Sequence, residues 1–274
     1  MNGTQEQPKT QYLDVPGGRI AYSVSGPEGG HLVVMAPGMG DLRAVYRFVV
    51  PRLVDAGYRV ATMDLRGHGE SSTGWDSHTT SAHGADYLAL IRHLGGPATV
   101  VGQSFTPDSV VSAAAELPEL ITGVVALSPW ANPPQPGRLM AAVTGVVLRT
   151  PFLWGLFYSS LYKAGKPADF KEYVATMKSR LREPGRTAAF VAVGDPKAKD
   201  SAAHRSQVHQ PSLILMGTKD PDFKDPRAEA EEFASGLAGP TEIVMVEGAG
   251  HYPQAEMPQE VAAALLAFLE KTAR

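Results

Sequence analysis

Cysteine is absent from the 274-residue sequence. Without a thiol, the chain can form no disulfide framework, thiolate zinc site, iron–sulfur cluster or cysteine nucleophile. Six histidines show no shared ligand spacing: His31, His78, His83, His93, His204 and His209. The chain also has no His-Glu-x-x-His pair. The sequence therefore implies no metal and no other cofactor.

An excess of positive charge is also missing. Lys and Arg total 25 against 28 Asp and Glu, which gives a formal net charge of -3. A chain with this balance has no basic footprint for gripping phosphate backbones, so we do not expect nucleic acid as a partner.

The sequence has no long uncharged apolar run. Its most apolar stretch, Leu139 to Tyr162, is divided by Arg149 and Pro151. Neither part reaches the roughly 18 residues of a spanning helix, so we expect no membrane span and interpret the stretch as a lid or core helix. Residues 1–10 are polar and carry no apolar core behind a basic start. They predict no secretory signal and a cytoplasmic location.

Strand-like and helix-like segments alternate along most of the chain. The predicted strands are Arg19 to Val24, His31 to Ala36, Tyr58 to Met63, Ala98 to Val101, Ile121 to Leu127, Leu213 to Met216 and Glu242 to Val246. The predicted helices are Arg43 to Ala56 (kinked or split at Pro51), Ala82 to Leu94, Pro107 to Leu117, Arg227 to Leu237 and Pro258 to Lys271. This order predicts an α/β fold with a mostly parallel central sheet and helices on both faces.

A long helical segment interrupts this alternation between Leu127 and Leu213, and it opens with Pro129, Pro133, Pro134 and Pro136. We predict an inserted helical cap at residues 132–206 and a core formed by residues 1–131 and 207–274. Insertions at the carboxyl edge of a parallel sheet are where substrate sites and lids tend to lie.

The most distinctive local pattern is Val100-Val101-Gly102-Gln103-Ser104-Phe105-Thr106-Pro107. It predicts a strand, a tight turn at Ser104, and a helix with proline near its first turn, which is the setting of a nucleophile elbow. The helix N-terminus and the Phe105 amide can stabilise negative charge there. The alternative is that Ser104 is a helix cap. Thr106 occupies the place where the usual pattern has a second glycine.

A serine nucleophile needs a histidine to accept its proton and a carboxylate to orient that histidine. Both residue types follow later strands. Asp220 lies in the loop after the strand that ends near Met216, and His251 lies in a glycine-rich loop after Val246. Ser104, Asp220 and His251 are therefore expected at the same edge of the sheet.

Four motifs in this order resemble the α/β-hydrolase fold family over nearly the whole chain. They are Pro37-Gly38-Met39-Gly40, Asp64-Leu65-Arg66-Gly67-His68-Gly69-Glu70-Ser71, the Ser104 elbow and Gly250-His251. The resemblance implies a triad of Ser104, Asp220 and His251, with Asp220 favoured over Asp222 by its spacing from Gly217. It places the oxyanion hole at the backbone amides of Met39 and Phe105. It also implies that Asp64, Arg66 and His68 form a structural loop.

The elbow residue bears on the reaction. Haloalkane dehalogenases and epoxide hydrolases of this family use an aspartate there, whereas this chain has Ser104. The sequence therefore predicts a cofactor-free serine hydrolase that cleaves a small or medium apolar ester or lactone through an acyl-enzyme. Two alternatives stay open: a cofactor-independent haloperoxidase or perhydrolase, and a small-molecule receptor that keeps the triad. The sequence does not determine the oligomeric state.

Aromatic residues of the cap are candidates for the substrate pocket. We expect Trp130, Trp154, Phe157 and Tyr158 to contact substrate, although each could instead pack the cap onto the core. The basic run Arg180, Arg182 and Arg186 is interpreted as a solvated helix face.

Overall fold

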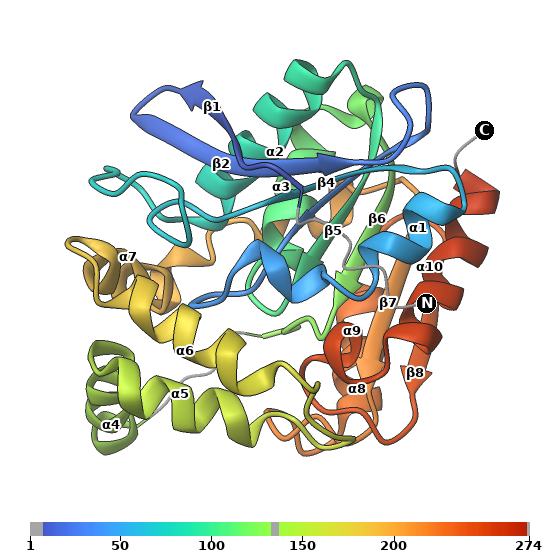
Figure 1. The fold of residues 1–274 in the computed structure, drawn as a ribbon. Helices are drawn as coiled ribbons and strands as arrows, with labels where there is room; N and C mark the ends of the chain where they lie inside the picture. Colours follow the sequence, from blue (N-terminus) through green and yellow to red (C-terminus); the bar gives the residue numbers. More distant parts are fainter. Residues whose placement is uncertain (1–7, 133–136, 273–274) are drawn as a thin grey trace.

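The computed structural model describes residues 8–132 and 137–272, and its centre is an eight-stranded sheet (Figure 1). The strand order is β1-β2-β4-β3-β5-β6-β7-β8. Strands β3 to β8 are parallel, whereas β1 and β2 pair antiparallel at one edge. The strands are β1 (Gln11–Val15), β2 (Gly18–Ser25), β3 (Leu32–Ala36), β4 (Arg59–Met63), β5 (Ala98–Gln103), β6 (Ile121–Leu127), β7 (Ser212–Gly217) and β8 (Thr241–Val246). The predicted α/β fold is therefore confirmed.

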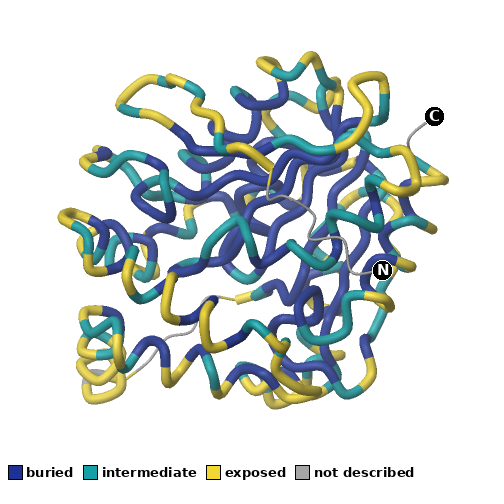
Figure 2. The backbone as a smooth tube through the Cα atoms, viewed as in Figure 1, coloured by how far each residue is buried: buried dark blue, intermediate teal, exposed yellow. Residues whose placement is uncertain are grey.

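The central strands are apolar because helices cover both faces of the sheet. The centre of the sheet is buried (Figure 2). Strand β3 is buried at every position, and its side chains alternate between two core clusters. Val33 and Met35 pack on the side of α1 (Val50–Asp55) and α10 (Pro258–Thr272). Val34 and Ala36 pack on the side of α2 (Thr80–Leu94), α3 (Pro107–Glu116) and α8 (Pro226–Ser235). The parallel pairing of β3 to β8 places the carboxyl ends of these strands at one edge of the sheet.

Pro51 divides the predicted helix from Arg43 to Ala56, as expected. A short 3-10 helix, η1 (Arg43–Tyr46), precedes α1, and Pro51 lies in the first turn of α1. Proline is tolerated there because it has no amide hydrogen to donate within the helix.

Strand β1 was not predicted. Its side chains are exposed or half-buried, and it pairs with β2 at the edge of the sheet. A short, polar edge strand lacks the apolar pattern that indicates a buried strand.

Helices fill the interval between β6 and β7, where the sequence predicts a cap. They are α4 (Arg138–Arg149), α5 (Pro151–Ser160), α6 (Phe170–Leu181), α7 (Arg186–Val193), η3 (Pro196–Ala198) and η4 (Ala202–Gln207). In Figure 1, α4 and α5 lie at the end of the molecule away from β1. Pro133, Pro134 and Pro136 lie outside the described residues, and the boundaries at 132 and 206 stay predictions.

Among the described residues, no single helix is long and apolar enough to cross a membrane. Helices α4 and α5 together meet the criterion by length and composition, with a bend of 108° between them. Residues 1–7, which hold most of the stretch that predicts no secretory signal, lie outside the described residues.

Candidate active site

Ser104 lies on the tight turn between β5 and α3. Its φ is 58°, in the left-handed region, which non-glycine residues occupy at a cost of about 1–2 kcal/mol. The turn also needs Gly102, because a Cβ there would lie 2.5 Å from the backbone of Thr106. Thr106, and not Ser104, is the N-cap residue of α3. The geometry is that of a strained elbow and does not fit a helix cap at Ser104.

Thr106 replaces the expected second glycine with a side chain that has a defined place. It is fully buried, and its Oγ1 accepts a hydrogen bond from the Gln103 amide at 2.7 Å. The same oxygen lies 3.1–3.3 Å from the carbonyl oxygens of Ala36, Pro37 and Gln103, to one of which it can donate. Thr106 therefore links the elbow to the loop that leads to Met39.

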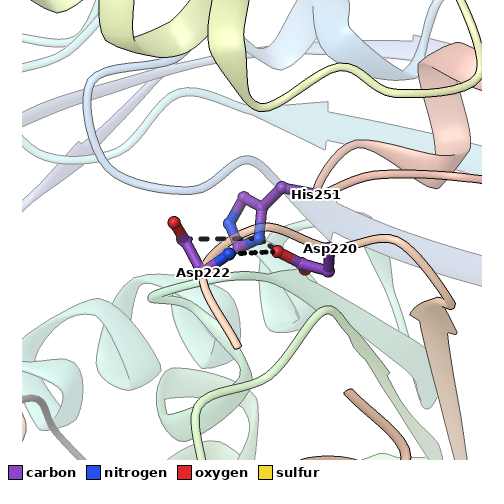
Figure 3. Close-up of side chains that lie close together, drawn as sticks. All are labelled: Asp220, Asp222 and His251. Atoms are coloured by element: carbon purple, nitrogen blue, oxygen red, sulfur yellow. Dashed lines mark hydrogen bonds and ion pairs between the residues drawn. The ribbon is translucent and has the colours of Figure 1, made fainter. Parts of the chain in front are cut away.

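His251 and Asp220 meet at the carboxyl edge of the sheet (Figure 3). The His251 Nδ1–H donates to Asp220 Oδ2 at 2.7 Å, and both side chains are buried. Asp222 Oδ2 is farther from Nδ1, at 3.6 Å. The Asp222 amide donates to Asp220 Oδ1 at 3.1 Å, which helps to fix the Asp220 carboxylate. The geometry therefore favours Asp220 over Asp222 as the residue that orients the ring.

The two carboxylates stabilise a positive charge on His251. Burial acts to lower the pKa of His251, but the charges of Asp220 and Asp222 and the Asp220 hydrogen bond outweigh it and raise the pKa to about 9. Burial also raises the pKa of Asp222, with His251 opposing that shift and Asp220 adding to it. Removal of the Asp222 charge would therefore lower the pKa of His251.

Ser104 and His251 line one cavity of about 380 Å³. Its wall is mostly apolar and includes Met39 and Phe105, the residues predicted for the oxyanion hole. In the part of the chain that the structure describes, neither the Met39 amide nor the Phe105 amide donates to a backbone carbonyl. Both are therefore free to donate to an oxyanion, next to the N-terminus of α3.

Three of the four predicted pocket residues line this cavity. They are Trp130, Trp154 and Phe157. Trp154 is buried against Phe190, and its Nε1–H donates to the Gly40 carbonyl at 3.2 Å. Phe157 is 41% exposed and lies at the cavity's outer side.

The prediction that Tyr158 contacts substrate is wrong, because Tyr158 does not line the cavity. It is fully buried, and its hydroxyl donates to Asp41 Oδ2 at 3.1 Å and lies 3.0 Å from the Tyr162 hydroxyl. Tyr158 follows Phe157 on α5, so it points to a different side of the helix. It packs the cap onto the core instead of facing substrate.

The sequence analysis missed the part of the cavity wall that α4 supplies. The residues are Met140, Val143, Thr144, Val147 and Leu148. Their spacing of three and four residues places them on one helix face. That spacing is visible in the sequence and is the signal by which these residues could be predicted.

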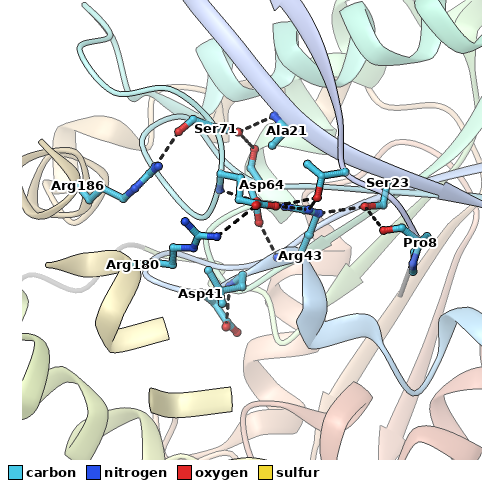
Figure 4. Close-up of polar contacts among 12 residues, drawn as sticks. Pro8, Ala21, Ser23, Asp41, Arg43, Asp64, Ser71, Arg180 and Arg186 are labelled. Atoms are coloured by element: carbon cyan, nitrogen blue, oxygen red, sulfur yellow. Dashed lines mark hydrogen bonds and ion pairs between the residues drawn. The ribbon is translucent and has the colours of Figure 1, made fainter. Parts of the chain in front are cut away.

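The loop after β4 forms a polar network on the other side of β3. Asp64 accepts hydrogen bonds from the amides of Arg43 and Glu70 and pairs with the Arg43 guanidinium (Figure 4). Arg66 binds Asp86 through two hydrogen bonds, of 2.6 and 2.9 Å. These contacts support the structural interpretation of Asp64 and Arg66.

His68 belongs to the same loop. Its Nδ1 lies 2.9 Å from the Arg66 carbonyl oxygen, and burial lowers its pKa to about 4. None of the residues Asp64, Arg66 and His68 lines the cavity that holds Ser104.

The prediction that Arg180, Arg182 and Arg186 form a solvated helix face is wrong. Of these three residues, only Arg182 is exposed. Arg186 is buried and donates to the Ser71 carbonyl at 2.7 Å, and Arg180 pairs with Glu70 and Glu183 (Figure 4). The run faces the core loop after β4 because the cap folds back over it. It is therefore a contact between cap and core.

A larger cavity of about 610 Å³ lies beside this network. Its charged lining residues include the pairs Arg43–Asp64 and Arg47–Asp169. Neither Ser104 nor His251 lines it. Its volume exceeds that of the Ser104 cavity, but its paired charges offer no reactive group.

One donor set in the described residues has metal-like spacing. Atoms of Asp220, Asp222 and His251 lie within 4.8 Å of one another. The His251 nitrogen in this set is Nδ1, which already bonds to Asp220. The arrangement therefore fits a carboxylate-oriented imidazole.

The model of the alpha/beta hydrolase family matches residues 33–264. That range includes the elbow, both later loops and every helix between β6 and β7. The chain belongs to the alpha/beta hydrolase family. The eight-stranded sheet and the helices inserted after β6 agree with this fold.

Two relatives match this hydrolase over nearly its full length. Epoxide hydrolase A of Mycobacterium tuberculosis is 28% identical over 323 aligned positions, which cover 96% of this chain and 97% of the relative. The 2-(acetamidomethylene)succinate hydrolase of Mesorhizobium japonicum is 28% identical over 265 positions, which cover 92% of this chain and 93% of the relative.

A solved structure with the same fold is a thermophilic esterase from Thermogutta terrifontis. It is 25% identical to this hydrolase, with a TM-score of 0.77, and the match covers 97% of this chain and 99% of the esterase.

Proposed function

We propose that the chain is a serine hydrolase that cleaves an apolar carboxylic ester or lactone through an acyl-enzyme on Ser104. The observation that carries the proposal is the shared apolar cavity. Ser104, held at a φ of 58° on the elbow, lines it together with His251, whose Nδ1 is bound to Asp220. No metal or organic cofactor takes part in the proposed reaction.

The proposed chemistry proceeds in two halves. Ser104 Oγ attacks the carbonyl carbon while His251 Nε2 takes the hydroxyl proton, because Nδ1 is engaged by Asp220. The Met39 and Phe105 amides donate to the resulting oxyanion. The carbon–oxygen bond then breaks, and His251 returns the proton to the leaving alcohol. Water, activated by His251, attacks the acyl carbon and restores Ser104.

The comparisons support a hydrolase but do not identify its substrate. One relative is named an epoxide hydrolase, but the epoxide hydrolases of this family use an aspartate at the elbow, where this chain has Ser104. Ser104 supplies a hydroxyl that a neighbouring base can activate, which suits acyl transfer. The apolar cavity wall favours an apolar acyl or alcohol group.

The direct test is labelling with a fluorophosphonate, followed by turnover of esters of graded length and of several lactones. We expect one adduct, mapped to Ser104 by peptide mass spectrometry, and many turnovers per chain. A folded protein that takes no label would contradict the proposal. A single slow acylation without turnover would favour the receptor alternative.

Phe157 should set the preference for long chains. We expect Phe157→Ala to lower kcat/KM for long apolar esters by about tenfold, and to change acetyl esters little, because a short acyl group leaves that part of the cavity empty. The matched control is Phe152→Ala on the same helix, since Phe152 is 57% exposed and does not line the cavity. Equal losses on short and long esters would show that Phe157 does not bind the chain.

A further inference from the structure

The cap exposes an apolar surface on α4 and α5. Seven of the eight large hydrophobic side chains exposed by the described chain belong to these two helices. They are Leu139, Met140, Val143, Val146, Phe152, Leu156 and Phe157, with exposed fractions between 41% and 81%. We call these seven residues the cap surface. Gathered apolar residues of this kind mark a place where another apolar phase or molecule binds.

The cap surface is continuous with the cavity that holds Ser104. Met140, Val143 and Phe157 belong to both, since they are exposed and also line the cavity. Leu139 and Val146 lie on the outer side of the same helix and do not line it. An apolar molecule would therefore meet hydrophobic side chains all the way from the outside of the cap to the cavity.

The chain segment that carries the cap surface has charged residues of one sign, although the exposed Asp195 also lines the cavity. No Asp or Glu occurs between Glu119 and Asp169, whereas Arg138, Arg149, Lys163 and Lys166 do. A second copy of this chain, seated on the same surface, would bring these like charges together, which is unfavourable. A surface of anionic lipid headgroups attracts them, and it accepts the apolar side chains below the headgroups.

We propose that α4 and α5 dock on an anionic lipid surface, from which the cavity takes up apolar ester substrate. The helices would lie along the surface, because neither alone is long and apolar enough to span a membrane and both expose apolar side chains. The substrate part of this inference rests on the proposed serine hydrolase function, but the docking part does not.

Vesicle flotation of the Ser104→Ala protein tests docking without product formation. We expect it to float with vesicles that contain phosphatidylglycerol and not with phosphatidylcholine alone, and salt should weaken the binding. The double variant Leu139→Asp/Val146→Asp should lose about tenfold or more in vesicle affinity while it keeps wild-type turnover of a short soluble ester. Tyr12→Asp is the matched control, because Tyr12 is exposed (44%) on β1, away from the cap.

Three results would overturn the docking proposal. They are no flotation with either vesicle, equal flotation with both, and a dimer in sedimentation velocity that the double variant abolishes. Failure of the proposed function is separate, because it would appear as loss of labelling at Ser104 with vesicle binding intact.

A different set of contacts ties the cap to the loop that carries Met39. Asp41 is buried, and its Oδ1 accepts hydrogen bonds from the Tyr173 hydroxyl at 2.5 Å and the Leu42 amide at 2.8 Å. The Tyr158 hydroxyl donates to Oδ2 at 3.1 Å, and Trp154 donates to the neighbouring Gly40 carbonyl. Helices α5 and α6 thus hold the loop on both sides of Asp41.

Independently of the lipid surface, we infer that Asp41 is a positioning residue for the Met39 amide in the proposed serine hydrolase reaction. Asp41 lies two residues after Met39, and both of its carboxylate oxygens are held by cap tyrosines. A small displacement of the loop would move the Met39 amide away from the oxyanion, where donors must lie within about 2.7–3.1 Å.

The test compares turnover with binding of a transition-state analogue. Tyr173→Phe and Asp41→Asn should each lower kcat by about tenfold and weaken inhibition by a trifluoromethyl ketone by the same factor, with KM little changed. Tyr22→Phe is the matched control, since Tyr22 is buried and its hydroxyl bonds to Gln11 and His93 instead.

Variants that stay folded with unchanged kcat, or that raise KM alone, would contradict the positioning role. If the wild-type protein itself binds no trifluoromethyl ketone and turns over no ester, the proposed function fails instead.

Discussion

Ser104→Ala should lower kcat on an activated ester by about 10⁵-fold or more, because the acyl-enzyme cannot form without the hydroxyl. Steady-state hydrolysis of a short soluble ester measures this loss. Removal of one oxygen from a side chain on the cavity wall changes little packing, so the free energy of unfolding should stay close to that of the wild type.

Ser109→Ala is the matched control for this change. Ser109 is a fully buried serine in α3, and its Oγ has no hydrogen-bond partner among the described residues. Its replacement should leave kcat within about twofold of the wild type, because Ser109 does not line the cavity and the loss of its hydroxyl breaks no hydrogen bond among the described residues. Comparable losses in the two variants, or a fluorophosphonate adduct that survives Ser104→Ala, would move the nucleophile elsewhere.

Asp220→Asn should lower kcat by about 10⁴-fold, the cost of the same change at the orienting aspartate of a serine protease triad. Asparagine keeps the shape but can present a donor to His251 Nδ1, which stabilises the wrong tautomer. Asp222→Asn should cost far less, because Asp222 lies 3.6 Å from Nδ1 against 2.7 Å for Asp220. The backbone amide of residue 222 would also still donate to Asp220 in this variant.

The pH profile separates the two aspartates further. The base is neutral His251, so kcat/KM should rise with pH through the pKa of that residue. Asp222 helps to raise this pKa. Asp222→Asn should therefore shift the rising limb to lower pH while it keeps the plateau. A shift to higher pH, or a larger loss from Asp222→Asn than from Asp220→Asn, would reverse the assignment.

Much of the core could be predicted because its signals are local. Strand β3 is apolar at every position because both of its faces are covered, and Pro51 splits a helix wherever that segment lies. The Ser104 turn follows from Gly102, the strand before it and the helix after it. Strand β1 was missed because an exposed edge strand carries no such pattern.

Contacts between distant segments could not be predicted in this way. The local sequence indicates only that Arg186 is a charged residue of a helix. In the structure it contacts Ser71, which is 115 positions away in the chain. Tyr158 is an aromatic residue next to Phe157 in the sequence, but in the structure its hydroxyl donates a hydrogen bond to Asp41. Neither contact leaves a trace in the local sequence.

The sequence by itself determined the order of strands and helices, the elbow at Ser104 and the loops that hold Asp220 and His251, because backbone sterics and hydrophobic periodicity act over a few residues. Only the tertiary structure decided that Asp220 and not Asp222 bonds to Nδ1, and that α4 supplies part of the cavity wall. It also decided that cap tyrosines hold the loop after Met39. Those outcomes depend on distances of about an ångström between residues far apart in the chain, which only the packing of sheet, helices and cap can set.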